Sequence, residues 1–248
     1  EMFRELGGEV RLGANIQGIE LRGKDVRYAP WGPSGIDHLI DSGGDTIEGS
    51  DYIFATGAWT QELLGRIGIF SGVLPKKRQL FGIKVDDPYA VAGDIDLDRV
   101  PALILPAAGT YVKPLLHRKL MILGLADGLG QPYDMSDPDF DLEYFERGIT
   151  PVLNHYFPRL RDFELKMKWA GYYAYHWPDK NPVVEAEKNL IWASGTSGSG
   201  IMKADGIGRI IASKALGFKE AELFDGSRMM VNDLSLRDRN VEMEKFVI

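Results

Sequence analysis

Apolar and polar positions alternate differently along the chain, and each pattern predicts its own kind of structure. Residues 9 to 55 carry short apolar stretches separated by turn residues, such as the DSGGD sequence at 41–45, which is typical of β-strands. The apolar stretch at 51–55 runs into Thr56 and Gly57, and apolar residues at helical spacing then predict a helix over 59–67. This region therefore predicts strands that end in a strand–turn–helix unit.

The middle of the chain has a different pattern. Apolar-rich stretches at 78–85, 103–105, 110–113, 120–125 and 164–170 predict short strands with loops between them. Residues 141 to 157 carry Leu142, Phe145, Ile149 and Leu153 at a spacing that predicts one helix. We expect an α+β region here, built on a mixed or antiparallel sheet with one face covered.

A second strand–turn–helix unit follows at 189–208, with the sequence NLIWASGTSGSGIMKADGIG. An apolar strand at 190–193 leads into Gly195, Gly198 and Gly200, and we expect a helix from about 203 to 216, before Gly217. Glycines let the backbone come close to a ligand, and the first N–H groups of a helix attract anions. The unit is either an anion-binding loop or a tight turn without a ligand. Two such units favour an α/β nucleotide-binding domain.

Composition and charge narrow the function classes. A net charge of −7 with interspersed signs argues against nucleic acid as a main partner, and we interpret the basic run Lys76–Lys77–Arg78 as a solvated strand end. The chain has no cysteine, which excludes a disulfide, thiolate catalysis or a cysteinyl cofactor link within it, and its four histidines lack metal-ligand spacing. We expect no metal site and a cytoplasmic location. Membrane association and an oligomer stay open.

Three motifs together resemble the D-amino-acid-oxidase-like superfamily of FAD-dependent oxidoreductases. They are ATGAW at 55–59, WAGYYAYHWPDKNPVV at 169–184 and SGTSGSGIMKADGIG at 194–208. The chain looks most like archaeal-type L-proline dehydrogenase β-subunits among these enzymes. It contains no G-x-G-x-x-G fingerprint, and it begins within an apparent helix end. We therefore expect it to be the C-terminal two-thirds of such an enzyme.

The resemblance implies a fold and a domain order. It implies a partial Rossmann-like FAD-binding domain of α/β type, joined to a substrate domain with a mixed or antiparallel sheet. The FAD-binding domain would take residues 1–73 and return at 183–217. The substrate-binding domain would take residues 74–182, and residues 218–248 would form a tail.

The resemblance also implies which residues hold FAD, without a covalent cysteinyl link. Ile16 resembles a strand residue that touches the adenine, although core packing explains it equally well. The other implied cofactor-binding residues lie in the two strand–turn–helix units: Thr56, Gly57, Ala58, Trp59, Gly195, Ser197, Gly198, Ser199, Gly200, Ile201, Met202 and Lys203. Lys203 is interpreted either as a cation near the flavin or as a solvent-facing lysine.

Three residues are candidates for the catalytic site. Tyr111 resembles a family tyrosine that faces the substrate carboxylate over the flavin, and a core tyrosine is the alternative. Tyr173 stands where amino-acid oxidases often carry a carboxylate-binding arginine, which another part of the protein would then have to supply. His176 is either a base in the pocket or a hydrogen-bonded loop residue.

One further position bears on the electron acceptor. Sarcosine oxidases carry a lysine implicated in oxygen activation where this chain has Ile122. We therefore expect a dehydrogenase that oxidises a secondary amine or amino acid, proline- or sarcosine-like, and passes electrons to a quinone, a dye or a carrier protein. The alternatives are a non-catalytic flavin- or nucleotide-binding fragment or subunit of such an enzyme and, third, an NAD(P) enzyme.

Overall fold

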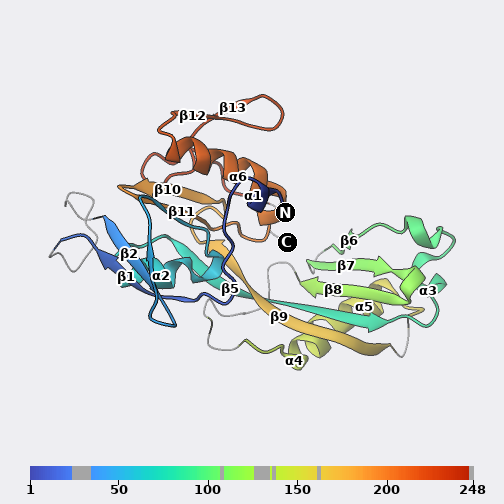
Figure 1. The fold of residues 1–248 in the computed structure, drawn as a ribbon. Coiled ribbons are helices and arrows are strands. Elements are labelled where there is room, and N and C mark those ends of the chain that lie inside the picture. The colour runs from blue at the N-terminus through green and yellow to red at the C-terminus, as the bar shows by residue number, and fades with distance from the viewer. Residues whose placement is uncertain (24–34, 107–108, 126–134, 136–137, 161–162, 246–248) are drawn as a thin grey trace. The chain divides into compact units, whose positions relative to one another are not determined.

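The chain forms two compact units in a computed structural model (Figure 1). The structure describes residues 1–23, 35–106, 109–125, 135, 138–160 and 163–245. The first unit comprises Glu1–Gly72, Val183–Ser194 and Asp205–Asn240. The second comprises Val73–Pro182, Gly195–Ala204 and Val241–Ile248. The glycine loop and the first residues of the following helix thus belong to the second unit, whereas the strand before them belongs to the first.

The first unit contains three small sheets. Strands β1 (Ile16–Leu21), β2 (Ile36–Asp41) and β3 (Thr46–Glu48) form an antiparallel sheet in chain order. The second sheet has the order β10 (Val183–Glu187), β11 (Leu190–Ser194) and β4 (Tyr52–Phe54), in which β11 runs parallel to β4. Strands β12 (Glu220–Glu222) and β13 (Arg228–Met230) form a hairpin in the segment that we expected to be a tail.

Helices follow the strands of the second sheet. Strand β4 leads into a 3-10 turn (Gly57–Trp59) and then into α2 (Thr60–Arg66), while β11 leads through the glycine loop into α6 (Gly200–Ala215). A short helix, α1 (Met2–Glu5), begins the chain. Buried side chains from β2, β4, α2 and β11 form the core: Ile36, Phe54, Leu64, Leu190 and Trp192. Both predicted strand–turn–helix units are present.

The second unit is built on a five-stranded sheet in which every neighbouring pair is antiparallel. Its order is β6 (Leu103–Ile104), β7 (Thr110–Leu115), β8 (Leu120–Leu125), β5 (Val73–Lys84) and β9 (Glu164–His176). This confirms the expected fold class, a partial α/β domain joined to a sheet domain. The two long strands, β5 and β9, exceed the lengths that apolar patterning predicted.

One face of this sheet packs on the helices of the second unit. These are α3 (Tyr89–Ala92), α4 (Leu142–Tyr144), a π-helical turn (Phe145–Ile149) and α5 (Thr150–Tyr156), and 3-10 turns lie at Leu97–Arg99 and Leu116–Arg118. Phe145, Ile149 and Leu153 pack against the fully buried Phe81 and Leu123. The helix predicted over 141–157 is thus present as continuous helical residues from 142 to 156, with a π-helical turn in the middle. Pro151 lies in the first turn of α5, where it has no N–H to donate to the preceding turn.

The basic run at 76–78 is not a solvated strand end, contrary to our interpretation of the sequence. Lys76, Lys77 and Arg78 are 6%, 3% and 8% exposed in the middle of β5. The charged ends of Lys76 and Arg78 lie over the rings of Tyr175 and Tyr173, which the adjacent strand β9 supplies. Within the described residues, no helix is both long enough and apolar enough to cross a membrane.

Candidate functional site

The first strand–turn–helix unit places its four candidate residues in one tight turn of the first unit. Gly57 has φ of +55°, a conformation that favours glycine. Ala58 is buried at 3% exposure, while Trp59 presents its ring at 53% exposure. The Ser194 hydroxyl at the end of β11 donates a 2.8 Å hydrogen bond to the Gly57 carbonyl. The ends of the two parallel strands are therefore tied together at this turn.

A cavity of about 470 Å³ lies beside this turn. It brings Ile16 together with Thr56 and Trp59, which lie far from it in the sequence. The other residues that line it are Ala14, Asn15, Gln17, Glu62, Leu63 and Arg66. Its lining thus combines apolar side chains with polar and charged ones. Ile16 is half-buried and packs against the core, so it both supports the core and lines the cavity.

The glycine loop belongs to the second unit, and contacts with His176 hold it in place. Gly195 and Gly198 have φ of +74° and +95°, and a Cβ at Gly195 would lie 2.9 Å from the Cβ of His176. Ser197 also has a positive φ, +48°, and is fully buried. Its hydroxyl accepts a hydrogen bond from the His176 N–H and donates one to the Gly195 carbonyl, both 3.1 Å long. A strained residue that is held so firmly is typical of a functional loop.

The loop ends at the N-terminus of α6. Ser199 donates a 3.0 Å hydrogen bond to the Thr196 carbonyl, and Gly200 begins the helix. Ile201 and Met202 in the first turn are 97% and 77% exposed. Lys203 forms a 2.7 Å ion pair with Glu244, so its charge is engaged by the C-terminal segment. The first N–H groups of a helix have no partner within it and can hold an acceptor atom.

His176 is the last residue of β9 and contacts the glycine loop. It is 1% exposed, and its Nδ1 lies 2.8 Å from Oδ1 of Asp179, which also accepts the Asn181 N–H at 2.9 Å. Of our two interpretations of His176, a hydrogen-bonded residue fits this arrangement better than a base in the pocket. It makes His176 a support for Gly195 and Ser197.

Tyr111 and Tyr173 lie on the face of the five-stranded sheet opposite the core helices. Register places Tyr111, Gly124, Leu80 and Trp169 in one row across β7, β8, β5 and β9. Ile122 and Tyr173 lie on the same side of the sheet. Ile122 is two residues from Gly124 along β8, and Tyr173 is four residues from Trp169 along β9. We call this surface the Tyr111 face. Burial, with a smaller contribution from Tyr173, raises the pKa of the Tyr111 phenol above its ordinary value, so the hydroxyl stays protonated as a donor.

Sequence reasoning missed the cations on the Tyr111 face, among them Arg78 and Lys113. Arg78 is buried there, with its guanidinium carbon 5.2 Å from the centre of the Tyr173 ring. Lys113 is exposed directly opposite Ile122 on the neighbouring strand. Alternation along each strand was the available signal, because Tyr111 and Lys113 are two residues apart.

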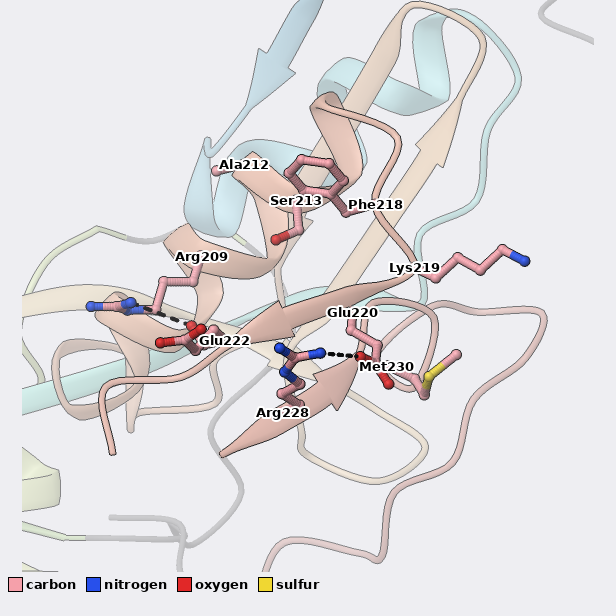
Figure 2. Close-up of a pocket in the computed structure, with 9 residues that line it drawn as sticks. All are labelled: Arg209, Ala212, Ser213, Phe218, Lys219, Glu220, Glu222, Arg228 and Met230. Carbon is pink, nitrogen blue, oxygen red and sulfur yellow. Dashed lines mark hydrogen bonds and ion pairs between the residues drawn. The ribbon is translucent and has the colours of Figure 1, made fainter. Parts of the chain in front are cut away.

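A second, larger pocket of the first unit lies elsewhere. It has a volume of about 790 Å³ and lies between α6 and the β12–β13 hairpin (Figure 2). Arg228 and Glu220 pair across its wall at 3.2 Å, and Arg209 donates to the Glu222 carbonyl at 3.3 Å. None of our candidate residues lines it. The described residues also hold no group of three or more His, Asp or Glu side chains suited to a metal ion.

These features fit FAD, the cofactor that the resemblance implies. A cavity with a half-buried aliphatic wall and the exposed Trp59 ring accommodates a flat ring system such as adenine. A glycine loop that opens a helix accommodates a polar, electron-rich ring edge. The residues that the resemblance implies for FAD are Ile16 and Thr56–Trp59, which belong to the first unit, and Gly195 and Ser197–Lys203, which belong to the second.

Comparison with known proteins identifies the family. The model of the family "DAO: FAD dependent oxidoreductase" matches residues 1–214. The chain is 28% identical over 213 residues to FAD-dependent oxidoreductase domain-containing protein 1 of Xenopus laevis, covering 79% of this chain and 41% of that protein. The chain thus spans less than half the length of this relative.

Solved structures share the fold. The crystal structure of L-proline dehydrogenase from P. horikoshii matches with a TM-score of 0.67 at 21% identity, over 94% of this chain and 55% of that one. A modified fructosyl peptide oxidase from Aspergillus nidulans matches with a TM-score of 0.69 at 13% identity, over 98% of this chain and 57% of that one. The family model covers most of the chain, and the two strand–turn–helix units agree with it: this chain belongs to the DAO family of FAD-dependent oxidoreductases.

Proposed function

We propose that the chain is part of an FAD-dependent dehydrogenase that oxidises the C–N bond of a secondary amine or amino acid, proline- or sarcosine-like. The observation that carries this proposal is the Tyr111 face. It presents the protonated phenol of Tyr111 and the aliphatic Ile122 together on one side of an antiparallel sheet. The solved structures that share the fold include a protein named L-proline dehydrogenase, which supports the substrate class.

FAD, when bound, accepts a hydride equivalent from the carbon next to the substrate nitrogen. The residues of this chain supply the surroundings. Ile16 and Thr56–Trp59 would hold the adenine end. The first turn of α6 would offer its positive dipole end and its first N–H groups to negative charge on the bound cofactor. Tyr111 donates a hydrogen bond to the substrate, and Tyr173 lines the same face.

The choice of electron acceptor rests on Ile122. A cation at this position would stabilise a negatively charged oxygen species, and an aliphatic side chain offers no such attraction. We therefore propose a quinone, a dye or a carrier protein as the acceptor, in place of oxygen.

One observation favours an oxidase as the second candidate. Lys113 lies opposite Ile122 across the β7–β8 pair, and directly paired side chains lie about 5 Å apart at Cβ. Its ammonium could supply from the neighbouring strand the charge that Ile122 lacks.

The experiment compares rates of dye reduction and oxygen consumption in the flavin-loaded protein with L-proline and with sarcosine. A dehydrogenase reduces the dye far faster than oxygen. Ile122→Lys should raise the oxygen rate about tenfold or more, equivalent to about 1.4 kcal/mol, while Ile122→Met leaves it unchanged. Equal dye and oxygen rates in the wild type, lost in Lys113→Met, would instead establish the oxidase. Bound flavin that no amine reduces would favour a non-catalytic subunit.

A further inference from the structure

Residues 241–245 contain no helix or strand, yet hydrogen bonds hold them against the turn that follows β9. We call this segment the strap. The Asn181 side chain donates a 2.6 Å hydrogen bond to the Glu242 carbonyl, and the Glu244 N–H donates one of 2.8 Å to the Asp179 carbonyl. The strap belongs to the second unit, as do this turn and the glycine loop. The main chain of the strap is thus fixed to the turn.

The strap also reaches the first turn of α6, through a pair of charges. The Glu244 carboxylate forms a 2.7 Å ion pair with Lys203, and the two side chains are only 22% and 28% exposed. Water and salt screen a partly buried pair less than an exposed one. The Lys203 N–H donates to the carbonyl of Ser199 at 3.3 Å. The ion pair therefore anchors the end of the glycine loop that leads into α6.

The turn that the strap holds supports the other end of the glycine loop. Oδ1 of Asp179 lies 2.8 Å from Nδ1 of His176, whose main-chain N–H donates to the Ser197 hydroxyl. Ser197 donates its own N–H to the Ala174 carbonyl at 2.8 Å. Its φ of +48° is a strained conformation that persists only where the surroundings hold it. The strap therefore contacts the supports of both ends of the loop.

We propose that the strap clasps the cofactor-binding loop, and that Glu244 is a positioning residue for FAD. In this role Glu244 acts through Lys203 and through the main chain of Asp179. A loop that is already held in its bound conformation binds a ligand without a further cost of ordering. Releasing the strap should therefore weaken FAD binding and speed its dissociation. The inference goes beyond the proposed function, because it concerns retention of the cofactor and holds for any substrate or electron acceptor.

The test measures the Kd for FAD by titration of cofactor-free protein, and the rate of flavin release from the loaded protein. Glu244→Gln removes the charge at almost unchanged size and should raise the Kd about three- to tenfold, with faster release. Lys203→Met should act similarly, and the double variant should bind no more weakly than the weaker single variant, because both remove the same ion pair. Lys203→Arg keeps the pair and should stay within about twofold of the wild type.

Asp205→Asn is the matched control, because it breaks a 2.8 Å ion pair with Arg209 on the same helix that does not include the strap. It should change the Kd by less than about twofold. Urea unfolding of the cofactor-free variants is measured in parallel, and a loss of stability in Glu244→Gln with an unchanged Kd would overturn the proposal. Tighter FAD binding in Glu244→Gln would also overturn it, since Lys203 would then attract the cofactor directly. The assay contains no amine, so its result stands whether or not the proposed function holds.

Discussion

An alanine at position 124 should displace the ring of Tyr111. Gly124 lies directly across from Tyr111 in the β7–β8 pair, and a Cβ added to it would lie 2.3 Å from both Cζ and Oη of the tyrosine. Carbon atoms in contact normally stay about 3.5 to 4.0 Å apart. The ring must therefore move by more than about 1 Å, away from the position that we assign to substrate recognition.

The size of the effect follows from two opposing terms. Extra volume in a packed site costs about 1–3 kcal/mol of folding stability. When Tyr111 is already alanine, the space is free, and Gly124→Ala should then stabilise the protein by about 0.4–1 kcal/mol through the unfolded chain. The two substitutions should thus show a coupling energy of at least about 1 kcal/mol.

The assay is a double-mutant cycle. Urea unfolding is measured for the wild type, Gly124→Ala, Tyr111→Ala and the double variant, and kcat/KM is measured with the best substrate. Gly124→Ala should lower kcat/KM about tenfold or more in the wild-type background, which is about 1.4 kcal/mol, and little once Tyr111 is gone. If Gly124→Ala costs the same stability in both backgrounds and leaves kcat/KM unchanged, Tyr111 neither covers Gly124 nor serves the reaction.

Three further predictions concern the loop, its support and pH. Valine at Gly198, where φ is +95°, or at Gly200, where a Cβ would lie 2.8 Å from Thr196 Oγ1, should lower the bound flavin measured by absorbance, while circular dichroism stays unchanged. Asp179→Ala should remove the hydrogen-bond acceptor of His176, lower the free energy of unfolding in urea by about 1–3 kcal/mol and lower flavin retention. Full flavin retention would show that the His176–Asp179 pair does not support the loop. Because burial raises the pKa of Tyr111 above its ordinary value of 10.0, the unfolded chain loses that proton first, so stability should fall as pH rises above 10. Tyr111→Phe should reduce this loss of stability at high pH. An unchanged slope of stability against pH would contradict the burial of the Tyr111 hydroxyl.

The strand–turn–helix units were predictable because both carry strong local signals. The apolar run before Gly195 forms β11, and the helical spacing after it forms α6. Strand β8 matches the predicted 120–125. These signals lie within about ten residues of sequence, so one sequence suffices to find them.

The composition of the Tyr111 face was not predictable in the same way. The basic run at 76–78 resembles a solvated segment until its cross-strand neighbours are known, and Tyr173 and Tyr175 lie almost a hundred residues later. Long-range pairing, which no local pattern reports, decides which side of a strand meets which partner. The π-helical turn before Pro151 and the β12–β13 hairpin were missed for a smaller reason, because short elements carry weak periodicity.

The most direct test of the proposed dehydrogenase is anaerobic mixing of the flavin-loaded protein with substrate. The absorbance of oxidised flavin is followed with L-proline, with sarcosine and with pyrrolidine. We predict that a secondary amino acid bleaches the flavin band without oxygen, and that a dye restores the band far faster than air does. A flavin that stays oxidised with every amine and amino acid tested, in protein that retains its cofactor, would contradict the proposed function.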